Sequence, residues 1–205
     1  MDHADTKHRN PVHPFLMVFE WRDYFTKHTQ EPEHHPIQEN ANIFFRSYWC
    51  EGNHEDYSCF QAHETSEIYP NIFHMGRGST LMLPDGRTVL FMGGALSVDK
   101  AWRTPGYDWF HEETITTCDL DRLPDVHVDI VISHTCPVEF EILDDDKLDR
   151  DICQQALSHV LAKYHPSLWY FGHFHRFKKG YTMGCSWTAL TMAGCSNWWE
   201  HLAAQ

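Results

Sequence analysis

The segment SYWCEGNHEDYS, residues 47–58, changes abruptly from apolar to polar side chains. Its first half continues an apolar run, whereas Asn53, His54, Glu55 and Asp56 place an amide, an imidazole and two carboxylates directly after that run. Such groups are costly to bury unless they find bonding partners. The segment is therefore either a polar turn at the surface or the end of a strand that holds these groups at a reaction site.

Apolar runs that are rich in aromatic and β-branched residues predict the sheet to which this strand belongs. The predicted strands are residues 42–49, 88–96, 126–133 and 168–172. Near-continuous apolar character in three of them predicts burial on both faces of the sheet. We expect the PDGR turn at 84–87 to close a hairpin into the second strand, and the last 25 residues to form another hairpin with a short helical tail.

Residues 147–163 carry the clearest helical pattern in the sequence. The apolar residues that recur at steps of three and four are Leu148, Ile152, Ala156, Leu157, Val160 and Leu161. Pro166 ends the pattern. A strand, this helix and a further strand predict a βαβ unit with a right-handed crossover, and so an α/β fold with a mixed sheet.

The composition predicts one domain over residues 1–205, of which residues 1–40 are an atypical, His-bearing and polar segment. A formal charge of -13 disfavours broad contact with nucleic acid and a nuclease function, although a bound metal ion would reverse the local field for a small phosphorylated substrate. No apolar run reaches the length of a membrane span, so no membrane partner is expected. Seven cysteines without paired spacing and the lack of a signal-like N-terminus predict a cytoplasmic protein.

Polar side chains with metal-binding chemistry follow three of the predicted strands. They are Asn53 with His54, then His134, then His173 with His175. Ligands bind at the carboxyl ends of strands in open α/β sheets, so these residues predict a shared metal site. In an extended GHFH segment, His173 and His175 would point to one face while Phe174 packs behind. Imidazole and amide ligands suit Mn, Fe, Co, Ni or Zn better than Ca.

These blocks together resemble the calcineurin-like metallophosphoesterase family, in which Gly-Asn-His-Glu/Asp, a single His and Gly-His-x-His follow one another. The chain carries them in this order as GNHE, ISH and GHFH, and residues 90–114 resemble a subgroup found in bacteria and their phages. The resemblance covers roughly residues 40 to 200. It implies a sandwich of mixed β-sheets flanked by helices.

The resemblance also implies roles for single residues. Asn53, His134 and His173 would bind one divalent metal ion and His175 the other, with Mn as the expected metal and Fe, Co, Ni or Zn as alternatives. His54 would act as the general acid that faces the leaving-group oxygen, with Glu55 or Asp56 restraining its ring. The implied reaction is two-metal hydrolysis of a phosphomonoester or phosphodiester.

The chain departs from the family pattern before residue 52. There is no Asp-x-His block and no complete Gly-Asp-x-x-Asp block in this part, so we expect the N-terminal strand and its bridging aspartate to be missing, through truncation or divergence. One metal ion or none would then be retained. The alternative to a hydrolase is a catalytically impaired metal-binding relic or scaffold. Arg103 is a candidate substrate-binding residue, because guanidinium groups bind phosphate in a two-pronged manner.

Overall fold

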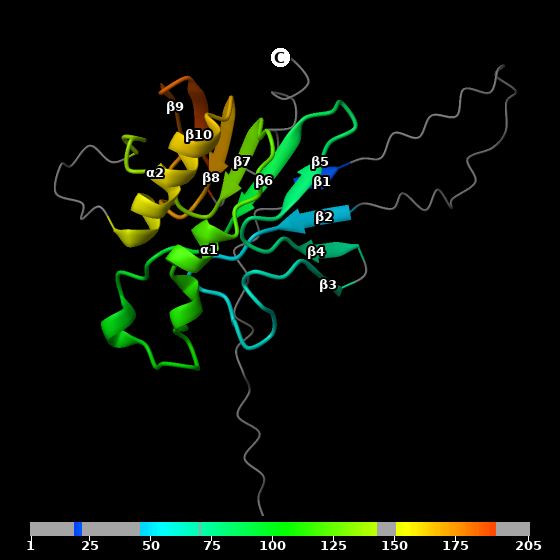
Figure 1. The fold of residues 1–205 in the computed structure, drawn as a ribbon. Helices are drawn as coiled ribbons and strands as arrows, with labels where there is room; N and C mark the ends of the chain where they lie inside the picture. The colour runs from blue at the N-terminus through cyan, green and yellow to red at the C-terminus, as the bar shows by residue number, and fades with distance from the viewer. Residues whose placement is uncertain (1–18, 22–45, 70, 143–150, 192–205) are drawn as a thin grey trace, which may run out of the picture.

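The apolar runs of the sequence form two mixed β-sheets with few helices (Figure 1). The structure is a computed structural model that describes residues 19–21, 46–69, 71–142 and 151–191. None of the helices in these ranges has the length and hydropathy needed to span a membrane.

The larger sheet contains the strands that lead to the candidate site. In the described ranges its six strands have the order β5-β6-β7-β8-β10-β9. The bounds are β5 (Thr80–Met82), β6 (Thr88–Met92), β7 (Ile130–Ser133), β8 (Leu168–Phe171), β9 (Lys178–Thr182) and β10 (Cys185–Ala189). β6, β7, β8 and β10 run parallel to one another, whereas β5 and β9 are antiparallel edge strands. The carboxyl ends of β6, β7 and β8 therefore lie at one edge of the sheet.

The smaller sheet packs against the larger one and has the order β1-β2-β4-β3. The bounds are β1 (Phe19–Trp21), β2 (Arg46–Trp49), β3 (Ser66–Tyr69) and β4 (Ile72–His74). β2 and β4 are parallel, and β1 and β3 pair antiparallel with them. Of residues 1–45, the structure describes only β1. The absence of the family's N-terminal strand therefore stays a prediction.

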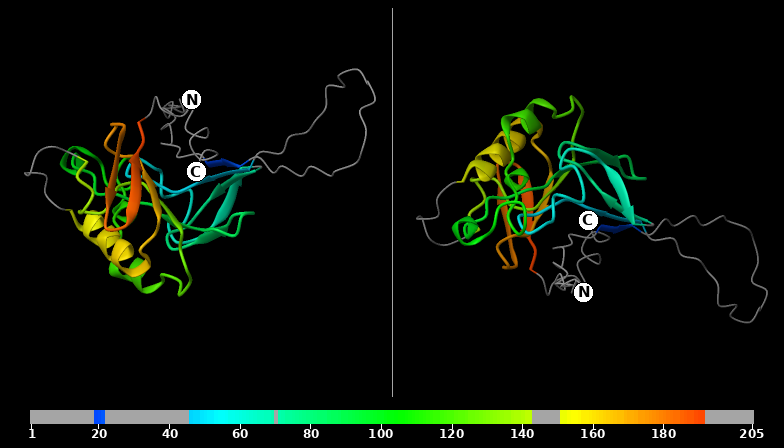
Figure 2. Two further views of the ribbon diagram at one scale, coloured as in Figure 1. Left: turned by 90° about the horizontal axis from the view of Figure 1, so that it is seen from above. Right: turned by 90° about the horizontal axis from the view of Figure 1, so that it is seen from below.

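Two apolar layers hold the sheets and the main helix together. Tyr48 and Phe73 of the smaller sheet pack against a buried cluster that includes Val89, Phe91 and Ile132 of the larger sheet. The other face of the larger sheet packs against α2 (Ile152–Tyr164). Figure 2 shows α2 (yellow) and the smaller sheet (cyan to green) on opposite sides of the larger sheet. The predicted burial of both faces is confirmed for β6 and β7.

α2 confirms the predicted βαβ unit with a later start. β7 and β8 are parallel and α2 connects them. Asp151 accepts a hydrogen bond from the Gln154 N–H at 2.9 Å, and this N-cap places the first helical residue at Ile152. The predicted residues 147–150 lie outside the described residues. His165 in the left-handed conformation, followed by Pro166, ends the helix.

The predicted apolar face of α2 is confirmed at four positions and wrong at one. Ala156, Leu157, Val160 and Leu161 are buried in the core, whereas Ile152 in the first turn is exposed. Leu148 lies outside the described residues.

Both predicted hairpins exist, but three predicted strands are too long. The PDGR turn joins β5 to β6, with Gly86 at a φ of 89°, and β9 and β10 form the second hairpin. Strand 88–96 ends at Met92 because Gly94 turns the chain with a φ of 92°. Strand 126–133 begins only at Ile130, and strand 168–172 ends at Phe171. Residues 42–45 and the predicted C-terminal helical tail lie outside the described residues.

The β6–β7 connection is long and carries the short helices η1 (Lys100–Trp102), η2 (His111–Glu113) and α1 (Thr117–Asp121). It lies beside the strand ends of the larger sheet, in green in Figure 1. A side chain from this connection can therefore reach the residues that follow β2, β7 and β8.

Candidate metal and catalytic site

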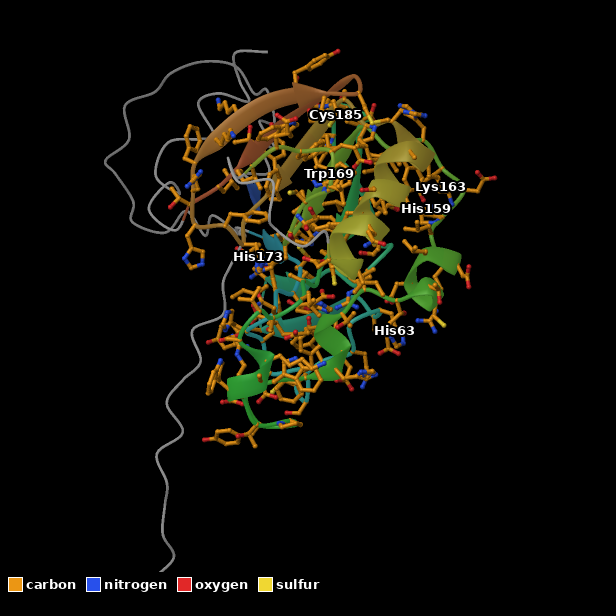
Figure 3. The ribbon with its side chains drawn as sticks, turned by 90° about the vertical axis from the view of Figure 1, so that its left-hand side faces the viewer. His63, His159, Lys163, Trp169, His173 and Cys185 are labelled. Carbon is orange, nitrogen blue, oxygen red and sulfur yellow. The ribbon has the colours of Figure 1, made fainter. Side chains whose placement is uncertain are left out.

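The three sequence motifs meet at one edge of the fold. Because β7 and β8 are parallel neighbours, His134 and Gly172 follow them side by side, and the Gly172 N–H donates to the His134 carbonyl at 3.0 Å. The end of β2 is joined to the end of β6 by a hydrogen bond of 2.8 Å from the Gly94 N–H to the Glu51 carbonyl. Figure 3 shows His173 where the strands end, facing the β6–β7 connection. The sequence prediction that these groups gather at strand ends is confirmed.

Asn53 and His134 form the centre of the site. Asn53 Oδ1 lies 3.0 Å from His134 Nε2, although the two residues are 81 positions apart in the sequence, and both side chains are buried. Burial lowers the pKa of His134 well below the ordinary value for histidine, and the charges of His173, His54 and His175 lower it further. His134 is therefore a neutral imidazole at neutral pH, the form that binds a metal ion.

Gly52 allows this close approach because it has no side chain. A Cβ atom at this position would lie 2.5 Å from Cε1 and 2.7 Å from Nδ1 of His134, closer than real Cβ contacts. Gly172, the glycine of the second motif, has no such contact, since a Cβ there would lie 4.0 Å from the nearest atom, the His134 carbonyl oxygen. The glycine before Asn53 thus serves the packing of the His134 ring.

The GHFH segment is a turn, so the prediction of an extended segment is wrong. His173 and His175 have φ values of 66° and 51°, in the left-handed region that residues other than glycine rarely adopt. The Phe174 N–H donates to the Gly172 carbonyl at 2.8 Å and closes the turn around His173. Phe174 packs on the core against Phe171, as predicted.

The two histidines of this turn differ in burial. His173 is partly buried and its ring lies 5.1 Å from the ring of His134, centroid to centroid. Burial lowers the pKa of His173 to about 4, with smaller contributions from the charges of His54 and His175. His175 is exposed, and its charge also lowers the pKa of His134 and His54. All four imidazoles therefore lie close enough to influence one another.

Arg103 contacts the turn that carries His54. Its Nη2 atom lies 2.7 Å from His54 Nδ1 and 3.0 Å from Nε2, and Nη1 donates to the Asn53 carbonyl at 2.9 Å. Asp99 accepts from Arg103 Nε at 2.9 Å. Burial, and then the Arg103 charge, lower the pKa of His54. The structure thus places Arg103 at the candidate acid, where its guanidinium donates to protein groups; its role toward substrate stays a prediction, as does the restraint of His54 by Glu55 or Asp56.

A buried ionic cluster supports the end of β2. Arg77 Nε donates to Glu51 Oε1 at 2.6 Å, and His74 Nε2 lies 2.9 Å from Glu51 Oε2. Arg77 Nη2 donates to the hydroxyl of Tyr57, which donates to the Gly52 carbonyl at 2.6 Å. The cluster therefore fixes the backbone that precedes Asn53.

Sequence reasoning missed this cluster, together with two residues of the β6–β7 connection: Ser97, which contacts Asn53, and Glu113, which contacts Ser97. Glu51 gave a sequence signal, because a carboxylate directly after a predicted buried strand demands a buried partner. Its partner Arg77 comes from 26 positions away and carried no such signal.

The donors at this edge fit one divalent ion. Asn53 Oδ1 and His134 Nε2 lie 3.0 Å apart, close enough that both would bind the same ion. With the neighbouring His173 they form a set of one amide and two neutral imidazoles, which suits Mn, Fe, Co, Ni or Zn. In the part of the chain that the structure describes, no group of three or more His, Cys, Asp or Glu side chains is arranged to hold an ion.

Comparisons with known proteins agree with the motifs. Residues 14–177 match the model of a family described as calcineurin-like phosphoesterase. The search of curated proteins gave no match. Two mixed sheets with few helices are consistent with the fold of that family.

Proposed function

Because the chain belongs to the calcineurin-like phosphoesterase family, we propose that it is a metal-dependent hydrolase of small phosphorylated molecules, either monoesters or diesters. The observation that supports this most is the buried contact of Asn53 Oδ1 with His134 Nε2, beside His173. These residues follow β2, β7 and β8, so three separate parts of the chain converge on one point.

Asn53, His134 and His173 would hold one ion, and His175 would contribute to a second. Mn is the expected metal, and Fe, Co, Ni or Zn are chemically compatible. When bound, the ions supply positive charge for the phosphoryl oxygens and a water molecule of lowered pKa. This positive charge also explains how a chain with a formal charge of -13 would accept an anionic substrate.

His54 would give a proton to the leaving-group oxygen. Its side chain is exposed at the turn that follows β2, and Arg103 holds the ring. Burial and Arg103 lower the pKa of His54 in the free protein, whereas a phosphate group next to the ring favours the protonated form. Substrate binding would therefore raise the pKa of His54, so that its ring carries a proton when the leaving group needs one.

The second candidate is a metal-binding relic that retains the Asn53 position and never assembles a second ion. The observation that favours it is that, among the described residues, no carboxylate forms a metal-binding group together with His134 and His173. Both candidates predict binding of at least one ion, and only the hydrolase predicts turnover.

Hydrolysis of p-nitrophenyl phosphate and of bis-p-nitrophenyl phosphate with Mn²⁺ separates the two. The hydrolase predicts that His54→Ala lowers kcat by about 10²–10⁴-fold while Mn²⁺ binding is retained. His159→Ala is the matched control, because His159 is exposed on α2, apart from His173 (Figure 3). Full turnover by His54→Ala would contradict the role of His54, and no turnover by the wild type with bound Mn²⁺ would favour the relic.

A further inference from the structure

Three buried side chains form a hydrogen-bonded chain that ends at the candidate metal position. Asn53 Nδ2 donates to Ser97 Oγ at 3.1 Å, and Ser97 Oγ donates to Glu113 Oε2 at 2.8 Å. The exposed fractions of Asn53, Ser97 and Glu113 are 6%, 4% and 1%. Water is therefore largely excluded from these contacts, and each polar atom depends on its protein partners.

The direction of these hydrogen bonds follows from the chemistry of Glu113. A carboxylate only accepts, and Glu113 Oε1 already accepts from the Ser97 backbone N–H at 2.8 Å and from Trp109 Nε1 at 3.0 Å. The single hydroxyl proton of Ser97 goes to Glu113 Oε2. The other acceptor within reach, the Asn53 carbonyl, is 3.3 Å away and accepts from Arg103 at 2.9 Å.

Ser97 Oγ can then only accept from the Asn53 side chain, so it must face the amide nitrogen. The amide oxygen is left on the opposite side, 3.0 Å from His134 Nε2. If the Asn53 amide were rotated by 180°, its NH₂ group would face His134. Its oxygen would then face Ser97 Oγ, whose only proton is already donated to Glu113. We propose that Glu113 and Ser97 are positioning residues that fix the Asn53 side-chain amide with its oxygen toward His134 and the metal.

This inference rests on the proposed function only in taking Asn53 as a metal ligand; the amide orientation itself can be read without metal. If Asn53 Oδ1 faces His134 Nε2, that nitrogen carries the ring proton in the metal-free protein. A rotated amide would donate to Nε2 and move the ring proton to Nδ1. The tautomer of His134 thus reports the orientation of Asn53.

The first test is the His134 tautomer in the full chain with EDTA, from long-range ¹H–¹⁵N NMR spectra assigned with His134→Asn. We expect the Nε2–H form in the wild type. Glu113→Gln lets the new amide nitrogen donate to Ser97 Oγ and frees the hydroxyl proton for Asn53, and Ser97→Ala removes the acceptor, so both should populate the Nδ1–H form. Glu112→Gln, an exposed neighbour of Glu113, should keep the wild-type tautomer.

An Nδ1–H form in the wild type would overturn the inference, and this result does not require Glu113→Gln or Ser97→Ala to fold. An unchanged tautomer in both Glu113→Gln and Ser97→Ala would overturn it as well. So would the same change in Glu112→Gln, because the effect would then be unspecific.

The second test measures Mn²⁺ affinity by calorimetry. Glu113→Gln and Ser97→Ala should weaken Mn²⁺ binding by about 10-fold, the usual effect of losing a group that orients a ligand. The double variant Asn53→Asp with Glu113→Gln should bind Mn²⁺ about 10-fold more tightly than Asn53→Asp alone. Only in the double variant is the Ser97 hydroxyl proton free to be donated to the new carboxylate. A purely structural role of Glu113 predicts additive losses, and additivity would overturn the inference.

The two proposals fail in different ways. If the wild type binds no Mn²⁺, the metal site of the proposed function fails, while the tautomer still decides the orientation of Asn53. If Mn²⁺ binds through Asn53 but the tautomer does not respond to Ser97 or Glu113, the orientation inference alone fails.

Discussion

Asn53 and His175 represent two differently built halves of the candidate site. Asn53 is buried, and its amide and carbonyl groups contact Ser97, His134 and Arg103. His175 is exposed, and its backbone adopts a left-handed conformation with a φ of 51°. The fold therefore holds the candidate ligand Asn53 among buried side chains, whereas the candidate ligand His175 lies at the surface in a left-handed turn. The two halves differ in how they should respond to substitution.

The largest effect is expected beneath the Asn53 half. Arg77→Met would leave the Glu51 carboxylate buried without its guanidinium partner, which typically costs about 3–5 kcal/mol. Urea unfolding measures this loss in the free energy of unfolding. Arg122→Met, at an exposed position, is the control and should stay within about 0.5 kcal/mol of the wild type. A similarly small effect of Arg77→Met would show that the cluster does not support the β2 end.

Much of this architecture could be predicted from the sequence, because it depends on local patterns. The end of β7, both hairpins and most of the buried face of α2 follow from apolar periodicity and turn residues. The helix was predicted to start at residue 147, whereas the capping box of Asp151 and Gln154 places its start at Ile152.

The support of the site could not be predicted in this way. The contact of Glu113 with Ser97 spans 16 positions and that of Arg77 with Glu51 spans 26, and neither has a periodic signal. The left-handed φ values of His173 and His175 were equally hidden, because an extended backbone is the default expectation for histidine. Tertiary contacts impose both features.

A matched pair of glycine substitutions compares the two halves directly. In Gly52→Ala the new Cβ would lie 2.5 Å from His134 Cε1, so the ring must move. We expect a loss of about 1–3 kcal/mol in the free energy of unfolding and weakening of Mn²⁺ binding by about 10-fold or more. In Gly172→Ala the nearest atom is 4.0 Å away, and neither quantity should change appreciably. Equal effects of the two substitutions would contradict the proposed difference between the halves.

The backbone of the other half can be tested with glycine in place of histidine. At His175, glycine should give a more stable protein than alanine by about 1 kcal/mol, because it adopts a positive φ without steric cost. At the helical His159 the order should reverse, with alanine better by about 1 kcal/mol. Thermal or urea unfolding of the four variants checks both signs. The same order at both positions would exclude a left-handed His175.

The smallest effect is a dependence of stability on pH in the presence of EDTA. The pKa of His173 is lowered to about 4 in the folded chain, mainly by burial, whereas the pKa of a histidine in an unfolded chain is about 6.5. Between these values the unfolded chain binds a proton that the folded chain does not, so the free energy of unfolding should decrease as the pH falls through this window. His173→Gln should reduce this slope, and His159→Gln should leave it unchanged. A free energy of unfolding that rises on acidification would contradict the burial of His173.

The central claim is that Asn53, His134 and His173 hold a divalent ion, and metal stoichiometry tests it most directly. Elemental mass spectrometry of the full chain after equilibration with Mn²⁺ should give at least one ion per chain, and that ion should be lost in Asn53→Ala and kept in His159→Ala. Two ions would favour the hydrolase, and one would favour the relic. No bound manganese in the wild type, or equal binding by Asn53→Ala, would contradict the claim.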